Sequence, residues 1–579
     1  MACLYYIMLL AGVSLQRWPN IGRGKKMRKN FMLGLVVLVL VMAMTVSAIA
    51  CTDIPVSKGA SAGGYVMTTW TDDSGSDNTR INVVPAKDWP AGTMRTVLRN
   101  TDYGQFENIA TPIFSPGEIP QVAHTYQYIN ASYSFMNECG VGIGESTIGG
   151  DSRMRNTKGW FDIVELQRIA LERGKTAREV VMIMGELAEK YGYGIGGECL
   201  TVVDKDDCWV FEVFGPGPLW EPGSGEPGAV WAAVRMPEGY AGVCANRSRI
   251  GEVNPEDTAN YLCSKHIFSL AEEIGLWDSK SGKPFRVYET YGKKAYSPYN
   301  ARREWRVLDL LAPSMKLDPW LEQYPFAVKP DKPVTPQMLM AICRDHYEGT
   351  EFDLTKGLEA GPFGSPDRWP TPGSSNPKNS AGWERAISLF RTNLTVVFEM
   401  KDLPAAVGGL VWFAYDKPGT SCFIPIYSGV KYLPESFAKG NRGANYDVFN
   451  RESAWWAFNF VSNYANLKYS SMIKDIKAVS DPLEAEMFAV QPYIEKAALE
   501  LYAKDPELAK DFLTQYTNSV ANKVVAAYWK LASTLAARYT DGYTYGFNDG
   551  KLSQEGYPKA WLEAVGFGIS TIRPELRSK

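Results

Sequence analysis

The chain has 579 residues, of which 45% are hydrophobic, 12% aromatic and 22% charged. This composition excludes an intrinsically disordered chain and is sufficient for one large core or several domains. The net charge is -3, but the first 50 residues contain six Lys or Arg and no acidic residue. From Cys51 onward the chain contains 55 Lys or Arg and 64 Asp or Glu, which gives a net charge of -9, and it has no basic tract. The sequence therefore gives no reason to expect nucleic acid as a partner.

The first 50 residues have the pattern of a leader. Arg28 and Lys29 precede an apolar run over residues 31–44, and Ala48-Ile49-Ala50 supplies the small residues of a cleavage site. We interpret residues 27–50 as a signal peptide that is removed, and the residues before Met27 as an over-extended start. An uncleaved anchor is the alternative, because the apolar run is nearly long enough to span a bilayer. No second run of about 20 apolar residues follows, so we expect a periplasmic or extracellular protein with no membrane anchor after processing.

Metal and cofactor sites are not expected from the sequence. Eight cysteines remain from Cys51 onward, but none lies in a Cys-x-x-Cys or Cys/His spacing that binds zinc. The three histidines, His124, His266 and His346, are far apart in the chain. An exported protein can form disulfides, but the sequence does not predict which cysteines pair.

Strand patterning begins directly after Cys51. Residues 52–61 and 65–70 are predicted as strands joined by a Ser-Ala-Gly-Gly turn, so Cys51 would open the edge of a β-layer. A hairpin is predicted over residues 133–145, with its connection at residues 137–140. Two helices follow, one from about residue 162 to 172 and one from Thr176 to Gly192, in which Glu179 completes a capping box.

The remainder of the chain returns to strands and ends in helices. A Pro/Gly/Ser-rich stretch over residues 359–380 is predicted to be a surface loop. From about residue 452 the chain is predicted to be helical, including residues 482–503 and 506–537. The order of these elements predicts an α+β fold with helices packed outside antiparallel sheets. The further predicted strands are residues 197–204, 208–215, 229–236, 241–246, 394–400, 408–416 and 421–429.

Cys51 has three interpretations from its position alone. If cleavage exposes it, its thiol can be a nucleophile and its own α-amino group, with a reference pKa of about 7.7–8.0, can be the base. If it carries a lipid, both groups are blocked, because bacterial lipoprotein leaders also end in small residues before a cysteine. The third interpretation is a cysteine without a catalytic role. Strand-forming residues follow Cys51 at once in place of a Ser/Gly tether, which favours a cysteine held inside the fold.

Seven segments in chain order carry a family resemblance. The chain resembles the N-terminal-nucleophile (Ntn) cysteine dipeptidases, a family that includes the lactobacillar dipeptidases and, more distantly, the secernins. The similarity extends from Cys51 to about the end of the chain. The segments are CTDIPVSKGASAGG, MNECGVGIGEST, IALERGKTAREVVMIMGELAEKYG, WAAVRMPEGYAGVCANRSRI, RDHYEGTEFDL, AGPFGSPDRW and GGLVWFAYDKPGTSCFIPIYSG.

The resemblance implies a fold and an activity. The fold would be a four-layer αββα sandwich, with a catalytic domain over residues 51–430 and a mostly helical region over residues 431–579 packed on it. The activity would be dipeptide hydrolysis by a cysteine at the mature N-terminus. Choloylglycine hydrolases and penicillin V acylases share this fold and site plan, so hydrolysis of N-acyl amides is the alternative within enzymes. A lipid-anchored binding protein is the alternative of another class.

The resemblance also assigns roles to individual residues. It implies that an acid lies near the amine of the nucleophile, that two asparagines stabilise the oxyanion, and that an arginine lies near the nucleophile. Many cytosolic relatives have an arginine where this chain has Trp70, so thiol activation must rest more on the amine and on backbone donors. The catalytic candidates are Cys51, Asp73, Asn137, Asn246 and Arg303, and the substrate-binding candidates are Trp70 and Arg306.

The sequence thus predicts an exported cysteine dipeptidase without a cofactor, acting on a dipeptide or another small amide. While Ala50 remains bonded to Cys51, the catalytic base is an amide nitrogen, so the cytoplasmic precursor is expected to be inactive. The protein is a monomer or a homo-oligomer, which the sequence does not decide. The segment from Arg344 to Thr350 receives no predicted chemical role.

Overall fold

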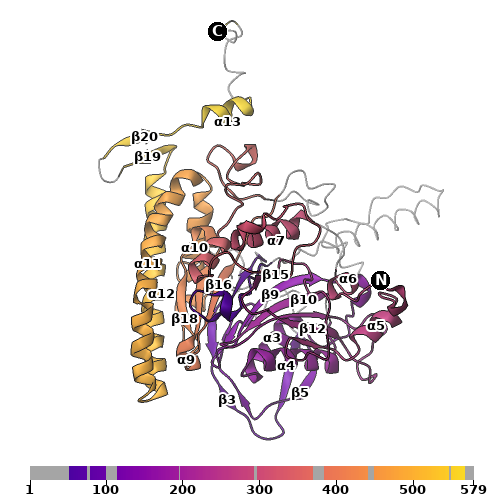
Figure 1. Ribbon diagram of the computed structural model, residues 1–579. Helices are drawn as coiled ribbons and strands as arrows, with labels where there is room; N and C mark the ends of the chain where they lie inside the picture. Colours follow the sequence, from indigo (N-terminus) through magenta and orange to yellow (C-terminus); the bar gives the residue numbers. More distant parts are fainter. Residues whose placement is uncertain are drawn as a thin grey trace, which may run out of the picture. The chain divides into compact units, whose positions relative to one another are not determined.

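Two antiparallel sheets form the centre of the structure, a computed structural model (Figure 1). The first sheet has four strands in the order β1-β16-β17-β18, formed by Val66–Asp72, Leu394–Met400, Gly409–Tyr415 and Ile424–Tyr427. Every residue of these strands is buried, so both faces of the sheet are covered. The structure describes residues 51–74, 79–99, 114–194, 196–292, 297–369, 384–440, 449–546, 550–566 and 575.

The second sheet has eight strands and contains the predicted hairpin. Its order is β14-β12-β11-β10-β9-β8-β7-β2. Within the predicted hairpin, β8 pairs with β9, but β8 begins only at Met136, so residues 133–135 do not belong to the strand. The strands are β2 Asn82–Val84, β7 Tyr128–Asn130, β8 Met136–Asn137, β9 Gly142–Gly149, β10 Gly197–Val203, β11 Cys208–Phe214, β12 Val230–Arg235 and β14 Tyr261–Cys263.

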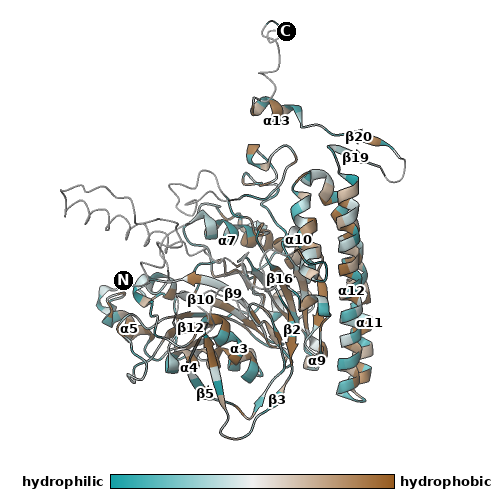
Figure 2. Ribbon diagram, turned by 180° about the vertical axis from the view of Figure 1, so that it is seen from behind, coloured by the Kyte–Doolittle hydropathy of each residue, from teal (hydrophilic) through white to brown (hydrophobic). Residues whose placement is uncertain are grey.

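Helices cover the two sheets on different sides. The strand β1 packs across β9, β10 and β11, which places the two sheets against each other. The helices α3 (Ile163–Arg173) and α4 (Ala177–Tyr191) pack on the eight-stranded sheet (Figure 1). The helices α10 (Ala454–Ala465), α11 (Tyr469–Tyr502) and α12 (Pro506–Arg538) pack on the four-stranded sheet. Figure 2 shows hydrophobic residues concentrated in the strands, as this arrangement requires. The α+β class is confirmed.

Local signals place the two central helices where the sequence predicted them. The side chain of Asp162 accepts a hydrogen bond from the backbone of Glu165 and caps α3. The side chain of Thr176 caps α4 by accepting from the backbone of Glu179. Gly192 ends α4 with φ 88°, a backbone conformation that L side chains rarely adopt.

The C-terminal helices differ in one boundary from the prediction. The helix α11 begins at Tyr469 and runs through Pro482 and Pro492, whereas the sequence predicted a helix start at Pro482. Proline is favoured in the first turn of a helix, which is why the sequence predicted a start there. The longer helix is stabilised because one face of α11 is buried against α12 and the four-stranded sheet. The helix α12 begins at Pro506 as predicted, with Asp505 as its cap.

The predicted strand over residues 52–61 is wrong. The segment forms single bridges, with Asp53 opposite Cys244 and Val56 opposite both Met67 and Ala241, and then a short 3-10 helix, η1 (Lys58–Ala60). Threonine side chains replace the missing ladder bonds, because the backbone N–H groups of Thr52 and Ile54 donate to the hydroxyls of Thr71 and Thr69 on β1. Cys51 is thereby fixed beside β1 without belonging to a strand.

The predicted strand over residues 241–246 is also shorter than expected, since only β13 (Ala241–Gly242) forms, paired with β15 (Ala327–Val328). The remaining strands are β3 Lys87–Asp88, β4 Met94–Arg99, β5 Phe114–Pro120, β6 His124–Thr125, β19 Tyr543–Tyr545 and β20 Leu552–Gln554. The remaining helices are α5 Ile267–Glu273, α6 Val287–Thr290, α7 Pro298–Leu311, α8 Pro336–Cys343, α9 Ala405–Gly408 and α13 Lys559–Ala564. Further 3-10 helices are η2 Ser152–Met154, η3 Ser279–Ser281, η4 Pro313–Met315, η5 Leu358–Ala360, η6 Pro418–Thr420 and η7 Glu435–Phe437.

Two predictions fall partly or wholly outside the described residues. The leader over residues 1–50 is one, and residues 370–380, half of the loop predicted over residues 359–380, are the other. Among the helices that the structure does describe, none is both long and apolar enough to cross a bilayer.

The close approach of the two sheets at Gly144 predicts a stability effect. A Cβ on Gly144 would lie 2.6 Å from the hydroxyl of Thr201 and 2.9 Å from the carbonyl oxygen of Thr69. We expect Gly144→Ala to lower the free energy of unfolding by about 1–3 kcal/mol, because the added methyl group overpacks the space between β9 and β1. Urea unfolding of the mature chain measures this. Gly556→Ala, whose Cβ meets nothing within 4 Å, is the control and should change stability by less than about 0.5 kcal/mol. An equal effect of both variants would contradict the packing described here.

Candidate active site

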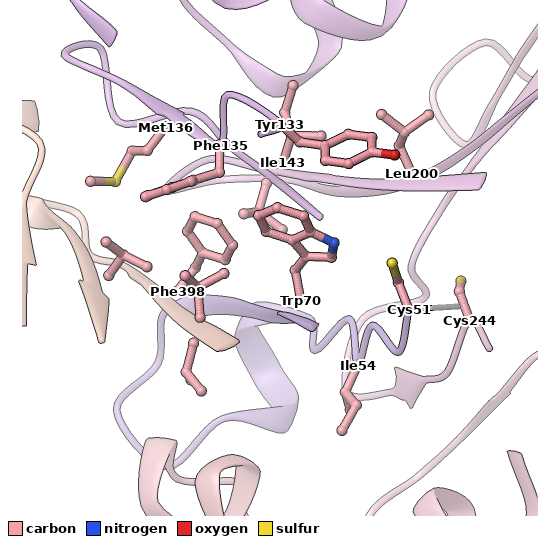
Figure 3. Packing of buried hydrophobic residues seen from close by; sticks show 14 of the residues in the cluster. Cys51, Ile54, Trp70, Tyr133, Phe135, Met136, Ile143, Leu200, Cys244 and Phe398 are labelled. Atoms are coloured by element: carbon pink, nitrogen blue, oxygen red, sulfur yellow. The ribbon is translucent and has the colours of Figure 1, made fainter. Parts of the chain in front are cut away.

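Cys51 lies at the margin of the hydrophobic core (Figure 3), and its sulfur contacts a carboxylate. The residue is fully buried, and its Sγ donates a hydrogen bond to Oε2 of Glu145 on β9 at 3.2 Å. The Oε1 atom of the same carboxylate accepts from the hydroxyl of Thr147 at 2.9 Å, which fixes its orientation. The nucleophile candidate therefore shares a buried polar environment with an acid that the sequence did not single out.

Arg303 holds the backbone at Cys51. Its Nη1 atom donates to the carbonyl oxygen of Cys51 at 2.7 Å and to the hydroxyl of Thr52 at 2.9 Å. Arg303 reaches this place from α7, which begins at Pro298 with Ser297 as its cap. Burial and the neighbouring charge of Arg385 lower the pKa of the Arg303 guanidinium to about 10, so it remains a cation near neutral pH.

Asn246 lies at the end of the segment after β13 and accepts hydrogen bonds from two arginines. Its Oδ1 atom accepts from Arg303 at 2.8 Å and from Arg385 at 2.9 Å, while its Nδ2 atom donates to the carbonyl oxygen of Thr147 at 2.8 Å. Because both arginines bind the oxygen, the amide is fixed with its nitrogen as donor. The backbone of Asn246 has φ 59°, a left-handed conformation in which Asn is enriched.

Asp73 is the second carboxylate at Cys51, and it has a cationic partner. Its Oδ2 atom accepts from Arg385 at 2.5 Å and from the hydroxyl of Thr71 at 3.0 Å, and its Oδ1 atom accepts from Thr392. The side chains of Asp73 and Arg385 are both fully buried, so each charge depends on the other for compensation. The backbone N–H of Asp73 also bonds to the sulfur of Cys51.

We call these residues the Cys51 cluster: Cys51, Thr52, Thr71, Asp73, Glu145, Asn246, Arg303 and Arg385. The cluster raises the pKa of the Cys51 thiol well above its ordinary value. Burial is the main cause, followed by the negative charges of Glu145 and Asp73. A thiol in this environment stays protonated unless a nearby base takes its proton. In the full sequence Ala50 precedes Cys51, so the nitrogen of Cys51 is there an amide and cannot be that base.

Asn137 is not brought into the Cys51 cluster. Its amide nitrogen donates to the carbonyl oxygens of Leu171 and Gly174 at 2.9 and 2.8 Å, and its oxygen accepts from the backbones of Cys139 and Val141. These contacts tie the β8–β9 hairpin to the end of α3. Both amide hydrogens are thus donated to carbonyls, which leaves neither of them for an oxyanion.

The two substrate-binding candidates also lie outside the Cys51 cluster. Trp70 is fully buried in β1 among apolar side chains, with its ring 5.6 Å from that of Tyr133 in a T-shaped arrangement (Figure 3). Arg306 forms a bidentate pair with Asp345 at 2.9 and 2.7 Å. Trp70 therefore acts as a core residue, and Arg306 as a structural ion-pair partner.

The segment from Arg344 to Thr350 supports the cluster from outside. Asp345 binds Arg306 of α7, and the hydroxyl of Tyr347 donates to the carbonyl oxygen of Arg385. Arg344 donates to Glu484 at 3.1 Å, which ties the segment to α11. The segment thus connects Arg385 of the cluster, and the helix α7 that carries Arg303, to α11, a role that spacing along the chain did not reveal.

Four members of the Cys51 cluster were missed from the sequence: Thr52, Thr71, Glu145 and Arg385. For Glu145 a signal was present, because an acid inside a predicted strand is rarely buried without a reason. Thr52, Thr71 and Arg385 carry no local pattern that marks them. Within the described ranges, no group of three His, Cys, Asp or Glu side chains is arranged to hold a metal ion.

A family comparison decides which class of protein carries this cluster. The model of peptidase family C69 matches residues 50–481, most of the chain, and the match includes every residue of the Cys51 cluster. The chain belongs to peptidase family C69. This confirms the family relationship that the seven segments predicted and identifies the protein as a cysteine peptidase.

Individual relatives of this C69 peptidase are similar over most of their length. A probable dipeptidase of Salmonella dublin is 25% identical over 417 residues, covering 68% of this chain and 84% of the relative. Probable dipeptidase A of Streptococcus pyogenes serotype M3 is 23% identical over 498 residues, covering 82% and 97%. Probable dipeptidase B of Lactococcus lactis is 25% identical over 408 residues, covering 68% and 77%.

The contacts of the two asparagines predict different outcomes for their variants. We expect Asn137→Ala to lower the free energy of unfolding by at least about 2 kcal/mol, because it leaves two buried carbonyls without donors. Its kcat/KM per folded enzyme should stay within about threefold of the parent. Asn246→Asp, which removes a donor fixed by two arginines, should lower kcat by about a hundredfold or more. Urea unfolding and steady-state kinetics on one dipeptide measure both. A hundredfold loss of kcat in folded Asn137→Ala would place Asn137 in the oxyanion site instead.

Proposed function

We propose that this C69 peptidase is an exported dipeptidase that transfers an aminoacyl group to the thiol of Cys51. The observation that carries the proposal is the fixation of Cys51 itself, whose sulfur faces Glu145 and whose carbonyl oxygen is bound by Arg303. The names of the relatives, probable dipeptidases of three bacterial genera, support a dipeptide as the substrate.

The fold that suits this chemistry is the four-layer sandwich of Ntn-hydrolases. The two facing antiparallel sheets, with α3 and α4 on one and α10 to α12 on the other, support this assignment. In it, residues 51–430 are the catalytic domain and residues 431–579 the helical region packed on it. The Cys51 cluster would lie where the first residue of the mature chain meets both sheets.

The chemistry begins with cleavage of the bond between Ala50 and Cys51. The freed α-amino group, with a reference pKa of about 7.7–8.0, takes the thiol proton in its neutral form. The thiolate attacks the carbonyl carbon of the dipeptide, forming an S–C bond and an oxyanion. The ammonium of Cys51 returns the proton to the leaving nitrogen, and the C–N bond breaks. The C-terminal amino acid leaves, and the first residue remains as a thioester.

A water molecule completes the cycle. The neutral amine of Cys51 accepts its proton while the oxygen attacks the thioester carbonyl, and the S–C bond then breaks to restore the thiol. Asn246, held by Arg303 and Arg385, is the proposed oxyanion donor in both steps. Asp73 is proposed to stabilise the ammonium form of the amine.

The burial of Cys51 argues for catalysis and against a lipid anchor. A diacylglyceryl group on the sulfur would need an exit to the membrane, whereas the side chain is fully buried beside Glu145. Export itself rests on the leader pattern before Cys51 and on the need for a free cysteine at the mature N-terminus. Intact mass of the mature protein would show a chain beginning at unmodified Cys51.

The nucleophile assignment predicts the effect of removing the sulfur. We expect Cys51→Ala in the mature chain to lower kcat/KM for dipeptides at least about a thousandfold, with unchanged thermal stability of the fold. Hydrolysis of alanyl-alanine followed by released alanine measures this. Cys263→Ala is the control, at a cysteine that is only partly buried and lies outside the Cys51 cluster, and it should keep parental activity. Retained hydrolysis in Cys51→Ala would refute the proposed mechanism.

The role of the amine predicts that a blocked N-terminus silences the enzyme. A chain that keeps Ala50 in front of Cys51 should show kcat lowered at least about a hundredfold, because an amide nitrogen cannot act as the base. The same preparation should gain full activity after an aminopeptidase removes the alanine. Equal activity before and after removal would contradict a role for the α-amino group.

A further inference from the structure

Two members of the Cys51 cluster are bound by an arginine that lies outside every helix and strand. Arg385 donates to Oδ2 of Asp73 at 2.5 Å and to Oδ1 of Asn246 at 2.9 Å. Residues 384–388 belong to no regular element, so the backbone ladder of a helix or sheet does not fix them. The place of Arg385 therefore depends on the contacts that this stretch makes with other parts of the chain.

Tyr347 makes such a contact. Its hydroxyl donates a hydrogen bond to the carbonyl oxygen of Arg385, and its ring belongs to a small apolar cluster with Ala386. The carbonyl oxygen of Asp345 accepts from the backbone N–H of Ser388 at 3.1 Å. Residues 345–347 thus hold both ends of the stretch that begins at Arg385. Burial raises the pKa of the Tyr347 hydroxyl well above its ordinary value, so the hydroxyl remains a donor.

The backbone of Tyr347 has a conformation that a bulky residue rarely adopts. Its φ is 65°, in the left-handed region, and such strain persists only where the surrounding contacts impose it. The N–H of Tyr347 donates to Oδ1 of Asp345 at 2.8 Å, and its carbonyl oxygen accepts from the hydroxyl of Thr350 at 2.7 Å. Asp345 is fixed in turn by its bidentate pair with Arg306. These contacts impose the conformation that directs the Tyr347 side chain at Arg385.

Arg385 is contacted by two residues in the left-handed conformation. Asn246 accepts a hydrogen bond from its guanidinium, and Tyr347 donates one to its carbonyl oxygen. Asparagine is enriched in this conformation, whereas tyrosine is an outlier in it. Backbone strain concentrates at functional sites, which connects Tyr347 with the chemistry at Cys51. The non-glycine residues that the structure describes with a positive φ are Asn246, Lys316, Tyr347, Asp416 and Asp541.

We propose that Tyr347 is a positioning residue for the reaction at Cys51, a role that rests on the proposed function. Tyr347 fixes Arg385, and Arg385 compensates part of the negative charge that Asp73 presents to the α-amino group of Cys51. The compensation limits how strongly Asp73 stabilises the ammonium form. The neutral amine, which acts as the base, is then present near neutral pH.

Other charged groups at Cys51 come from three elements. Besides burial, the negative charges of Glu145 on β9, of Asp73 and of Asp72 at the end of β1 raise the pKa of the Cys51 thiol. Arg303 of α7 contacts the carbonyl oxygen of Cys51. A displaced Arg385 would change the balance of these charges at Asp73, since the two side chains are in direct contact.

Removal of one hydroxyl tests this role. Tyr347→Phe takes a donor from the buried carbonyl oxygen of Arg385 and keeps the ring. We expect kcat for alanyl-alanine to fall about tenfold while KM stays within about threefold, because Tyr347 acts through Arg385 and not on the substrate. The acidic limb of the kcat/KM profile reports the base of the free enzyme. It should move up by at least about 0.5 pH unit, since Asp73 would then stabilise the ammonium form more strongly.

Tyr291→Phe is the matched control. Tyr291 is also fully buried, and its hydroxyl donates to the carbonyl oxygen of Ile267 at 2.5 Å, outside the Cys51 cluster. The control loses a hydrogen bond of the same kind, so it should lower the thermal stability as Tyr347→Phe does. Its kcat and its acidic limb should remain parental. The same kinetic changes in both variants would report a general effect of lost stability and would overturn the inference.

Thr350→Val is a second variant for the case that Tyr347→Phe does not fold. Thr350 is only half-buried, and its hydroxyl binds the carbonyl oxygen of Tyr347. Loss of this hydroxyl loosens the left-handed conformation and leaves the tyrosine ring in place. We expect kcat to fall at least about threefold and the acidic limb to move to higher pH, as for Tyr347→Phe. A parental kcat with a parental acidic limb would overturn the inference.

The outcomes separate this inference from the proposed function. If Cys51→Ala abolishes hydrolysis but folded Tyr347→Phe keeps the parental kcat and acidic limb, the nucleophile assignment stands and the inference is overturned. If kcat falls but the acidic limb does not move, Tyr347 does not act through Asp73, and the inference is again overturned. If Cys51→Ala remains active, the proposed function itself fails, and the positioning role fails with it.

Discussion

The hydrogen bonds from one buried guanidinium to Cys51 and Thr52, the first two residues of the proposed mature chain, are the constraint on which the rest of the site depends. Arg303 binds the carbonyl oxygen of Cys51, the hydroxyl of Thr52 and the amide oxygen of Asn246. A chain end normally frays, because nothing ties it down. In the proposed mature chain Cys51 is the terminal residue and must stay within about 0.5 Å of a productive geometry, and a buried cation with several acceptors supplies that rigidity.

Burying charge at this depth requires support from distant parts of the chain. Arg385 compensates Asp73 and shares Asn246 with Arg303, so the two arginines are coupled through one amide. Tyr347 binds the backbone of Arg385, and its neighbour Arg344 binds Glu484 on α11. The C-terminal helices therefore do more than cover the four-stranded sheet, since their contacts reach the site through a single short segment. Removing one member would leave an uncompensated charge in a low-dielectric interior.

Local chemistry explains what the sequence could predict. Residues close together in the chain predict the caps of α3 and α4 and the apolar strands of both sheets. The structure confirms these features. The segment after Cys51 was predicted wrongly because its bridge partner Cys244 is remote in the chain, and because the nearby β1 offers it threonine hydroxyls in place of a full strand ladder. Asn137 lies in a recognisable motif, but a motif does not say where an amide points. Glu145 is 94 residues from Cys51, and only folding brings the two together.

If the thiol of Cys51 becomes acylated during turnover, as proposed, mass spectrometry can detect the acyl group directly. The mature enzyme would be quenched in acid during steady-state hydrolysis of alanyl-alanine and digested for peptide mapping. We expect an alanyl group, as a thioester, on the peptide that begins at Cys51. An active enzyme that carries the alanyl group on another residue, or carries none under conditions where thioester hydrolysis limits the rate, would contradict it.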